Sequence, residues 1–144
     1  MRLFSDSSDA RLERLFALES LSGLSKKEVR QVIQAGTLVE VQVGHVLAEE
    51  DELADGSVYV VVSGSLNVVQ SGEPIRTTSE GDLLGEIGTV AGLYRTATVT
   101  ADTESELLHF PADAVAQLSA DVPAFRAILE RAAGKRLSRD RYTE

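Results

Sequence analysis

Hydrophobic positions near the start of the chain follow the period of an α-helix. After a polar opening stretch, apolar residues recur at helical spacing, at Leu12, Leu15, Phe16 and Leu21. Ser25 and Glu28 then form the Ser-x-x-Glu pattern of a capping box, and Gly36 is placed to end the helix that this box begins. These patterns predict two short amphipathic helices within residues 1–36.

From Thr37 the hydrophobic period changes to two. Val39, Val41 and Val43 alternate with polar residues, which is the pattern of a half-buried strand. Turn residues, among them Ser71 to Pro74, separate further short apolar runs at 45–47, 59–62, 66–69, 75–78, 96–101 and 107–110. Many short strands divided by turns are typical of an antiparallel jelly roll or barrel.

Helical periodicity returns after Pro111. Ala112 to Leu118 favours one helix, and Pro123 is suited to the first turn of another. We expect Gly134 to interrupt this last helix at a cost of about 1 kcal/mol relative to alanine. The predicted fold is α+β, a single domain over residues 1–144. An antiparallel β-roll or jelly-roll barrel (37–111) is flanked by N-terminal helices (1–36) and C-terminal helices (112–144).

Charge and composition narrow the possible functions. The chain has 144 residues, with 14 Lys and Arg against 23 Asp and Glu, a formal net charge of -9. Such a chain repels nucleic-acid backbones and anionic lipids. The absence of cysteine removes thiol chemistry and Cys-based metal sites. With neither a signal sequence nor an apolar membrane segment, we expect a cytoplasmic protein, and the chain length leaves no room for a DNA-binding domain.

Signatures of catalysis and metal binding are scarce. The two histidines, His45 and His109, each stand beside apolar residues in a predicted strand, which favours a structural role. The acidic run Glu49 to Glu52 lacks the spacing of an EF-hand and is interpreted as a solvated loop. An enzyme on a cupin-like barrel usually needs more histidines than this. We therefore expect no enzyme activity and no metal. The basic end of the last helix, at Lys135, Arg136, Arg139 and Arg141, is interpreted as an interaction surface rather than a DNA contact.

The most informative stretch joins two glycines to an isolated arginine. Gly85 and Gly88 let the backbone approach a ligand closely. They flank Glu86, where the pattern allows a helix to start, and the free N–H groups of a helix start form an anion site. Arg95 is the sole basic residue between Arg76 and Arg126, and a guanidinium can bind a phosphate in a bidentate manner. Glu86 is suited to accept a hydrogen bond from a sugar hydroxyl. An ion pair between Glu86 and Arg95 that only braces the loop is an equally open interpretation.

These residues also carry a resemblance. Gly85-Glu86-Ile87-Gly88 followed by Arg95-Thr96-Ala97-Thr98-Val99 resembles the phosphate-binding cassette of the cyclic nucleotide-binding domain family, which includes the catabolite activator protein and the regulatory subunits of cAMP-dependent protein kinase. Val58 to Leu66 and Gly81-Asp82 resemble other signatures of that family. The likeness spans roughly residues 37–111 and places the cassette at 83–99.

The resemblance implies a role for each cassette residue. Arg95 would grip the cyclic phosphate and Glu86 would accept the ribose 2′-hydroxyl, while Thr96 leaves both cAMP and cGMP open as ligands. Backbone N–H groups that would complete the cradle are those of Gly85, Ile87, Gly88 and Ala97. The implied function is a non-catalytic sensor whose C-terminal helix relays binding to an unidentified effector protein or to a second copy of the chain. The alternative is a ligand-free interaction or dimerisation module.

Overall fold

The N-terminal segment is helical, as the periodicity predicts, but the stretch from Leu12 to Leu21 that was predicted as one helix is divided into two. The computed structural model describes the backbone of residues 6–85 and 94–140 and the side chains of residues 10–85 and 94–135. Helix α1 spans Asp6–Leu15, the 3-10 helix η1 spans Glu19–Leu21, and α2 spans Lys26–Ala35. The capping box forms as expected: the Ser25 N–H donates to Glu28 Oε1 over 2.9 Å, and the Glu28 N–H donates to Ser25 Oγ over 3.2 Å.

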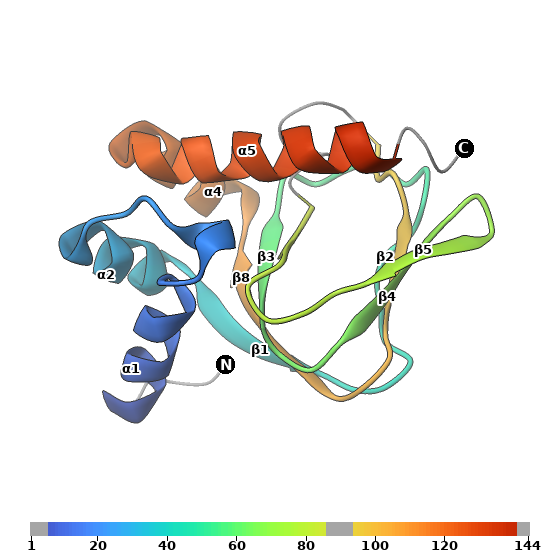
Figure 1. Ribbon diagram of the computed structural model, residues 1–144, viewed down its shortest axis with the longest axis horizontal. Coiled ribbons are helices and arrows are strands. Elements are labelled where there is room, and N and C mark those ends of the chain that lie inside the picture. The colour runs from blue at the N-terminus through green and yellow to red at the C-terminus, as the bar shows by residue number, and fades with distance from the viewer. Residues whose placement is uncertain (1–5, 86–93, 141–144) are drawn as a thin grey trace.

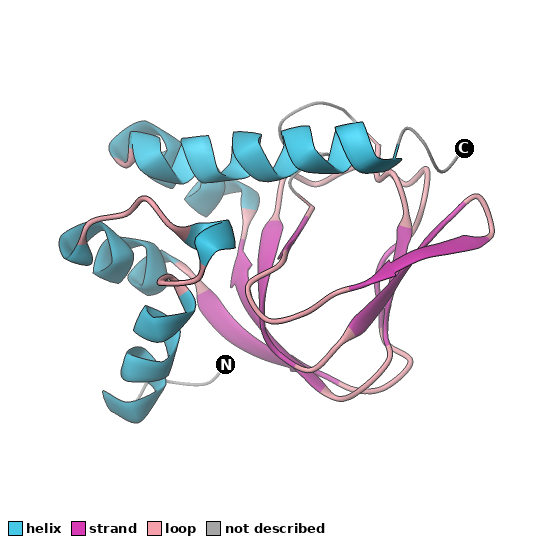
Figure 2. Ribbon diagram, in the orientation of Figure 1, coloured by secondary structure: helices cyan, strands magenta, loops and turns pink. Residues whose placement is uncertain are grey.

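Two four-stranded antiparallel sheets face each other to form the barrel (Figures 1 and 2). One sheet has the order β1-β8-β3-β6 and the other has the order β2-β7-β4-β5. The strands are β1 (Thr37–Val41), β2 (Val46–Ala48), β3 (Val58–Ser63), β4 (Leu66–Gln70), β5 (Glu73–Thr77), β6 (Leu83–Leu84), β7 (Thr98–Ala101) and β8 (Ser105–Phe110). The α+β jelly-roll architecture predicted from the sequence is confirmed.

Several strand boundaries differ from the predicted ones. β1 ends at Val41, so Val43 lies outside the sheet and its side chain is 66% exposed. β5 begins at Glu73 and includes Pro74, which was assigned to a turn. Proline is tolerated here because β5 lies at the edge of its sheet, and the register with β4 shifts between Val68 and Val69 where Pro74 pairs. β6 was not predicted because two residues carry no periodicity of their own.

Two helices follow the barrel, and the second crosses above it (Figure 1). Helix α4 spans Ala112–Asp121 and α5 spans Pro123–Asp140, with Pro123 at the first helical position as expected. The expected interruption at Gly134 is wrong, because α5 runs straight through it. Burial of Leu129 and Ala133 on the preceding turns supplies packing that outweighs the low helix propensity of one glycine.

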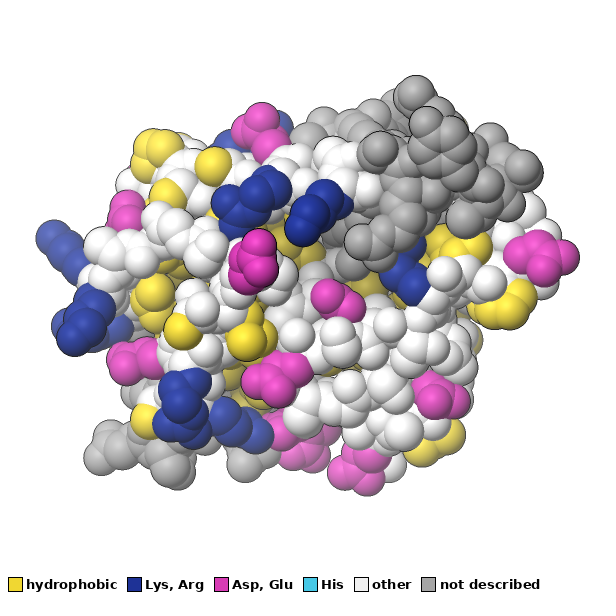
Figure 3. All heavy atoms as spheres, in the orientation of Figure 1, with side chains coloured by type: hydrophobic (Ala, Val, Ile, Leu, Met, Phe, Trp, Pro, Cys, Tyr) yellow, Lys and Arg dark blue, Asp and Glu magenta, His cyan; other side chains and the backbone are white. Residues whose placement is uncertain are grey.

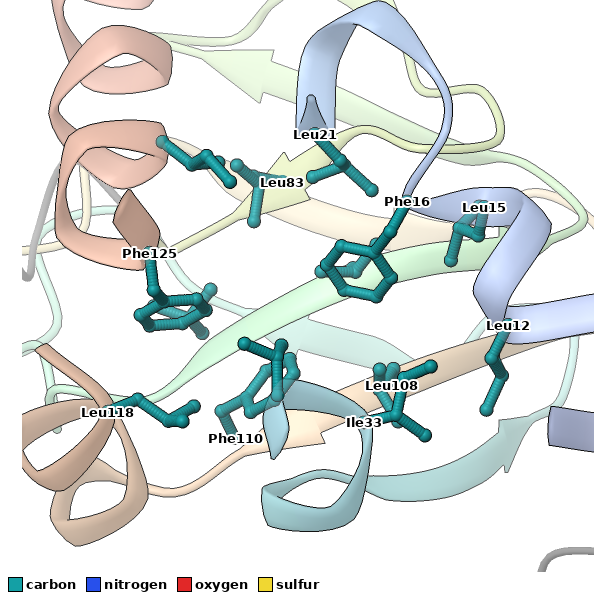
Figure 4. Packing of buried hydrophobic residues seen from close by; sticks show 14 of the residues in the cluster. Leu12, Leu15, Phe16, Leu21, Ile33, Leu83, Leu108, Phe110, Leu118 and Phe125 are labelled. Atoms are coloured by element: carbon teal, nitrogen blue, oxygen red, sulfur yellow. The ribbon is translucent and has the colours of Figure 1, made fainter. Parts of the chain in front are cut away.

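The core has two parts separated by the β1-β8-β3-β6 sheet. One cluster packs the helices against this sheet, and there the rings of Phe110 on β8 and Phe125 on α5 lie 5.6 Å apart (Figure 4). The second cluster fills the space between the two sheets and includes Val61, Leu66 and Leu107. The buried positions of Phe125, Ile128 and Leu129 show that these residues of α5 pack on the barrel. No helix in the described part of the chain is long and apolar enough to cross a bilayer.

Candidate functional site

The backbone of Arg95 is fixed by the acidic loop between β2 and β3. The Arg95 N–H donates to the Glu52 carbonyl over 2.8 Å, and the Arg95 carbonyl accepts from the Asp51 N–H over 2.9 Å. One residue away, Tyr94 forms an isolated β-bridge with Leu53. Asp51 has a positive φ of 69°, so it takes the left-handed turn conformation that aspartate tolerates better than most residues. The loop thereby holds Arg95 just ahead of β7.

The Arg95 side chain is largely buried and pairs with a carboxylate that the sequence did not single out. Its Nη2 donates to Asp55 Oδ1 over 2.7 Å, and the Arg95 side chain is 11% exposed against 71% for Asp55. Asp55 Oδ1 also accepts from the N–H and the hydroxyl of Ser57, over 2.9 and 2.6 Å. These Ser57 hydrogen bonds, followed by the charge of Arg95, lower the pKa of Asp55 below its ordinary value. Asp55 is therefore a fixed anion beside Arg95.

Gly85 forms the other wall around the guanidinium. It follows β6 with φ +90°, a conformation that side-chain-bearing residues rarely adopt. A Cβ at this position would lie 2.6 Å from the Ser57 carbonyl oxygen and 2.8 Å from Arg95 Nη1. Only glycine lets the chain pass this close to Arg95. The structure therefore brings Gly85 and Arg95 together, as the cassette interpretation requires.

An aromatic pair lies on the sheet near this cluster. The rings of Tyr59 on β3 and His109 on β8 stack with centroids 4.5 Å apart and an interplanar angle of 20°. Burial raises the pKa of the Tyr59 phenol, with the charge of Asp55 as a second cause. Burial also lowers the pKa of His109, although the Asp55 charge opposes that shift. His109 is thus a half-buried ring stacked on Tyr59, with burial favouring its neutral form.

The remaining cassette residues divide into two groups. Glu86, Ile87 and Gly88 lie outside the described residues, so their proposed contacts stay predictions. Thr96 and Ala97 are described: the Thr96 carbonyl accepts from Gln70 Nε2 over 3.1 Å, and the Ala97 side chain is buried between the sheets. Within residues 6–85 and 94–140 there is no group of three His, Cys, Asp or Glu side chains arranged to hold a metal.

Sequence reasoning missed Asp55 and Ser57. Only the run Glu49 to Glu52 was considered, as a solvated loop, yet the carboxylate of Asp55 just beyond it pairs with Arg95. The signal was local: an aspartate that bonds to the backbone N–H two residues ahead forms a turn, and Asp55-Gly56-Ser57 has the composition of such a turn. The sequence offers no comparable sign that Arg95, 40 residues further along, is its partner.

Comparisons with known proteins bear on the family and the fold of the chain. The cyclic nucleotide-binding domain profile matches residues 38–121. The Pycsar effector protein BcPycTIR of Burkholderia cepacia is 28% identical over 83% of this chain, which covers 39% of that protein. The cAMP-dependent protein kinase regulatory subunit of Yarrowia lipolytica is 36% identical over 58% of this chain, which covers 23% of the subunit.

A solved structure shows the same fold. The catabolite activator protein of Thermus thermophilus superposes with a TM-score of 0.74 at 21% identity, over 90% of this chain and 60% of that one. The chain spans well under half the length of the two curated relatives, so their whole-protein activities are not carried over from this likeness. The profile covers more than half of the chain, including β2 through β8, all of β1 except Thr37, and the described cassette residues. The chain therefore belongs to the cyclic nucleotide-binding domain family.

Proposed function

We propose that this domain is a non-catalytic sensor that binds cAMP or cGMP through the cassette at residues 83–99. The observation that carries the proposal is the buried guanidinium of Arg95 held against Gly85. Within the described residues, Asp55 engages one N–H donor of a side chain that has five. The other donors leave a fork suited to a bidentate contact with the exocyclic oxygens of a cyclic phosphate.

The remaining contacts of the nucleotide rest on the family resemblance. Glu86 accepts the ribose 2′-hydroxyl, and the N–H groups of Gly85, Ile87, Gly88 and Ala97 complete the phosphate cradle. Thr96 stands next to Arg95, where its hydroxyl is available to the phosphate or to a guanine, so both cyclic purine nucleotides are retained as ligands.

We further propose that α5 relays binding to a partner. The first half of α5 packs on the barrel through Phe125, Ile128 and Leu129, while the second half of the helix extends past Gly134. Ligand bound at the cassette changes the surface available to this second half. The helix has one position with nucleotide bound and another without it. The nucleotide shifts the helix between them because its affinity for the protein differs between the two positions. The partner is an effector protein or a second copy of the chain.

Isothermal titration calorimetry of the full chain with cAMP and with cGMP tests the sensor. Arg95→Gln removes the guanidinium, and Arg126→Gln is the matched control, because Arg126 is a half-exposed arginine paired with Glu130 on α5. We expect micromolar or tighter binding of at least one nucleotide, weakened at least about tenfold in Arg95→Gln and unchanged in Arg126→Gln. An absence of both heat and thermal shift with either nucleotide at millimolar concentration overturns the proposal.

The Arg95–Asp55 ion pair favours one alternative function. Because Asp55 already neutralises Arg95, the site is electrically complete without a ligand and suits a domain kept for interaction only. In that case the nucleotides give no signal, and analytical ultracentrifugation shows a dimer that Arg95→Gln leaves intact. A monomer that binds nucleotide excludes this alternative.

A further inference from the structure

A pocket with a basic lining lies between α5, η1 and the turn from β5 to β6. Its volume is about 530 Å³, within the range of small-molecule sites. Arg131 and Lys135 line it from α5, and Arg76 lines it from β5. On the face seen in Figure 3, basic side chains gather along α5 with acidic side chains beside and below them. Residues of both the C-terminal helix and the barrel thus line the pocket.

Arg131 is held in place without losing its charge. Its Nη2 donates to the backbone carbonyls of Ser22 and Ser20, over 3.0 and 3.4 Å. Carbonyl oxygens are neutral, so these bonds orient the guanidinium but leave a full positive charge at the pocket wall. Within the part of the chain that the structure describes, no carboxylate pairs with Arg131.

Lys135 stands one helical turn beyond Arg131. Side chains four residues apart share a helix face, and two like charges there repel. Lys135 forms no ion pair with any residue among 10–85 and 94–135. An anion between the two side chains would relieve their repulsion.

The rest of the lining defines the size and polarity of the ligand. The two acidic side chains on the wall are Glu19 and Asp82, and Asp82 is engaged by the Ser79 N–H over 2.8 Å. The described lining therefore carries three cations and two carboxylates, a net positive charge. Ser20, Ser22 and Thr77 add hydroxyl groups, while Leu83 and Ala132 supply a small apolar area. This combination suits a phosphate on a compact polyhydroxylated body.

We propose that this pocket binds a small hydroxyl-bearing phosphate monoester, with Arg131 and Lys135 contacting the phosphate and Arg76 facing them from the barrel. The described lining includes neither Gly85 nor Arg95, so the site is distinct from the phosphate cradle proposed there, although Leu83 at the start of the cassette contributes to its wall. A ligand here bridges α5 and the barrel, so it strengthens the attachment of the helix that the sensor proposal uses as a relay.

Titration calorimetry of the full chain with ribose 5-phosphate at low salt tests the site, with ribose as the uncharged matched probe. We expect saturable binding of ribose 5-phosphate alone. Lys135→Gln, which removes a charge but no hydrogen bond of the described structure, is expected to weaken it at least tenfold. Arg131→Gln is expected to do the same, with circular dichroism melting to confirm folding. Arg126→Gln on the same helix and Arg95→Gln at the cassette are expected to leave binding unchanged.

Three results overturn the proposal. The first is no saturable binding of ribose 5-phosphate, and the second is an equal loss in Arg126→Gln and Lys135→Gln, which indicates general charge attraction. The third is a loss confined to Arg95→Gln, which assigns the phosphate to the cassette. Each is independent of cAMP and cGMP binding, so the failure of this proposal and the failure of the sensor proposal are distinguishable.

Discussion

The two cationic sites of this domain hold their arginines by different means. Arg95 is fixed by the carboxylate of Asp55, which neutralises its charge, and Gly85 packs against it. Arg131 is fixed by the carbonyls of Ser20 and Ser22, which leave its charge intact. A carboxylate positions a guanidinium and competes with any anion for it, whereas carbonyls position it and leave it available. A ligand must therefore displace or share a partner at Arg95 but not at Arg131.

The largest expected effect comes from filling the gap beside Arg95. Gly85→Ala forces a side chain into φ +90° and into contact with the Ser57 carbonyl and Arg95, so we expect a loss of about 2–4 kcal/mol in the free energy of unfolding. Urea denaturation measures it. Gly72→Ala is the matched control, since Gly72 has φ +79° but open space around it. Equal losses in both variants would show that crowding at Arg95 plays no part.

The next effect tests the carbonyl-held arginine. Arg131→Gln removes both hydrogen bonds to the η1 segment and is expected to lower the free energy of unfolding by about 1 kcal/mol. Lys135→Gln removes an equal charge without a described hydrogen bond, so its change should stay within about 0.5 kcal/mol. Urea denaturation of the two variants separates the contribution of the hydrogen bonds to stability from the contribution of the charge. Equal changes in the free energy of unfolding for the two variants would show that the hydrogen bonds of Arg131 do not distinguish it from Lys135.

A smaller effect tests the helix that presents both cations. Gly134 lies between Arg131 and Lys135 in α5, and a Cβ there meets open space. Gly134→Ala is expected to raise the free energy of unfolding by about 0.5–1 kcal/mol through helix propensity. A loss of stability in a thermal melt would show that this turn is not helical, and the two cations would then not share a face.

The smallest effect tests the carboxylate-held arginine through pH. Asp55 has a lowered pKa in the folded state, so its stabilising contribution is present above the unfolded pKa of about 3.9 and is lost as pH falls through the folded value. Because its side chain is mostly exposed, we expect about 0.5 kcal/mol at neutral pH. Urea unfolding of wild type and Asp55→Asn, from neutral pH to about pH 3, measures the difference. A difference that grows toward acid pH contradicts the assignment.

The sequence allowed prediction of features that depend on neighbours in the chain. The capping box at Ser25 and Glu28 and the start of α5 at Pro123 are local, and both form where they were expected. β6 was missed because Leu83 and Leu84 become a strand only by pairing with Tyr59 and Val60. The expected break at Gly134 failed because packing of the surrounding turns decides the helix.

The candidate site was predictable in part for the same reason. Gly85 and Arg95 carry a motif, so the chain itself predicted that the two residues lie together, as they do. The Asp55–Arg95 pair depends on the loop after β2 folding back to the start of β7, which no local pattern shows. Arg131 was overlooked because its partners are carbonyl oxygens, which every residue possesses. The basic cluster at the end of α5 was noticed, and Lys135 connects it to the pocket.

The edge strand β5 has a consequence for how the protein behaves at high concentration. An exposed strand edge presents free N–H and C=O groups to which another copy can add a strand, and this addition leads to aggregation. Pro74 has no N–H to donate, and the register is irregular opposite it, in the hairpin that projects from the barrel in Figure 1. The negative charge of Glu73 repels a second copy of the same strand. Pro74, which the sequence pattern placed in a turn, thus disfavours edge-to-edge pairing between copies of the domain.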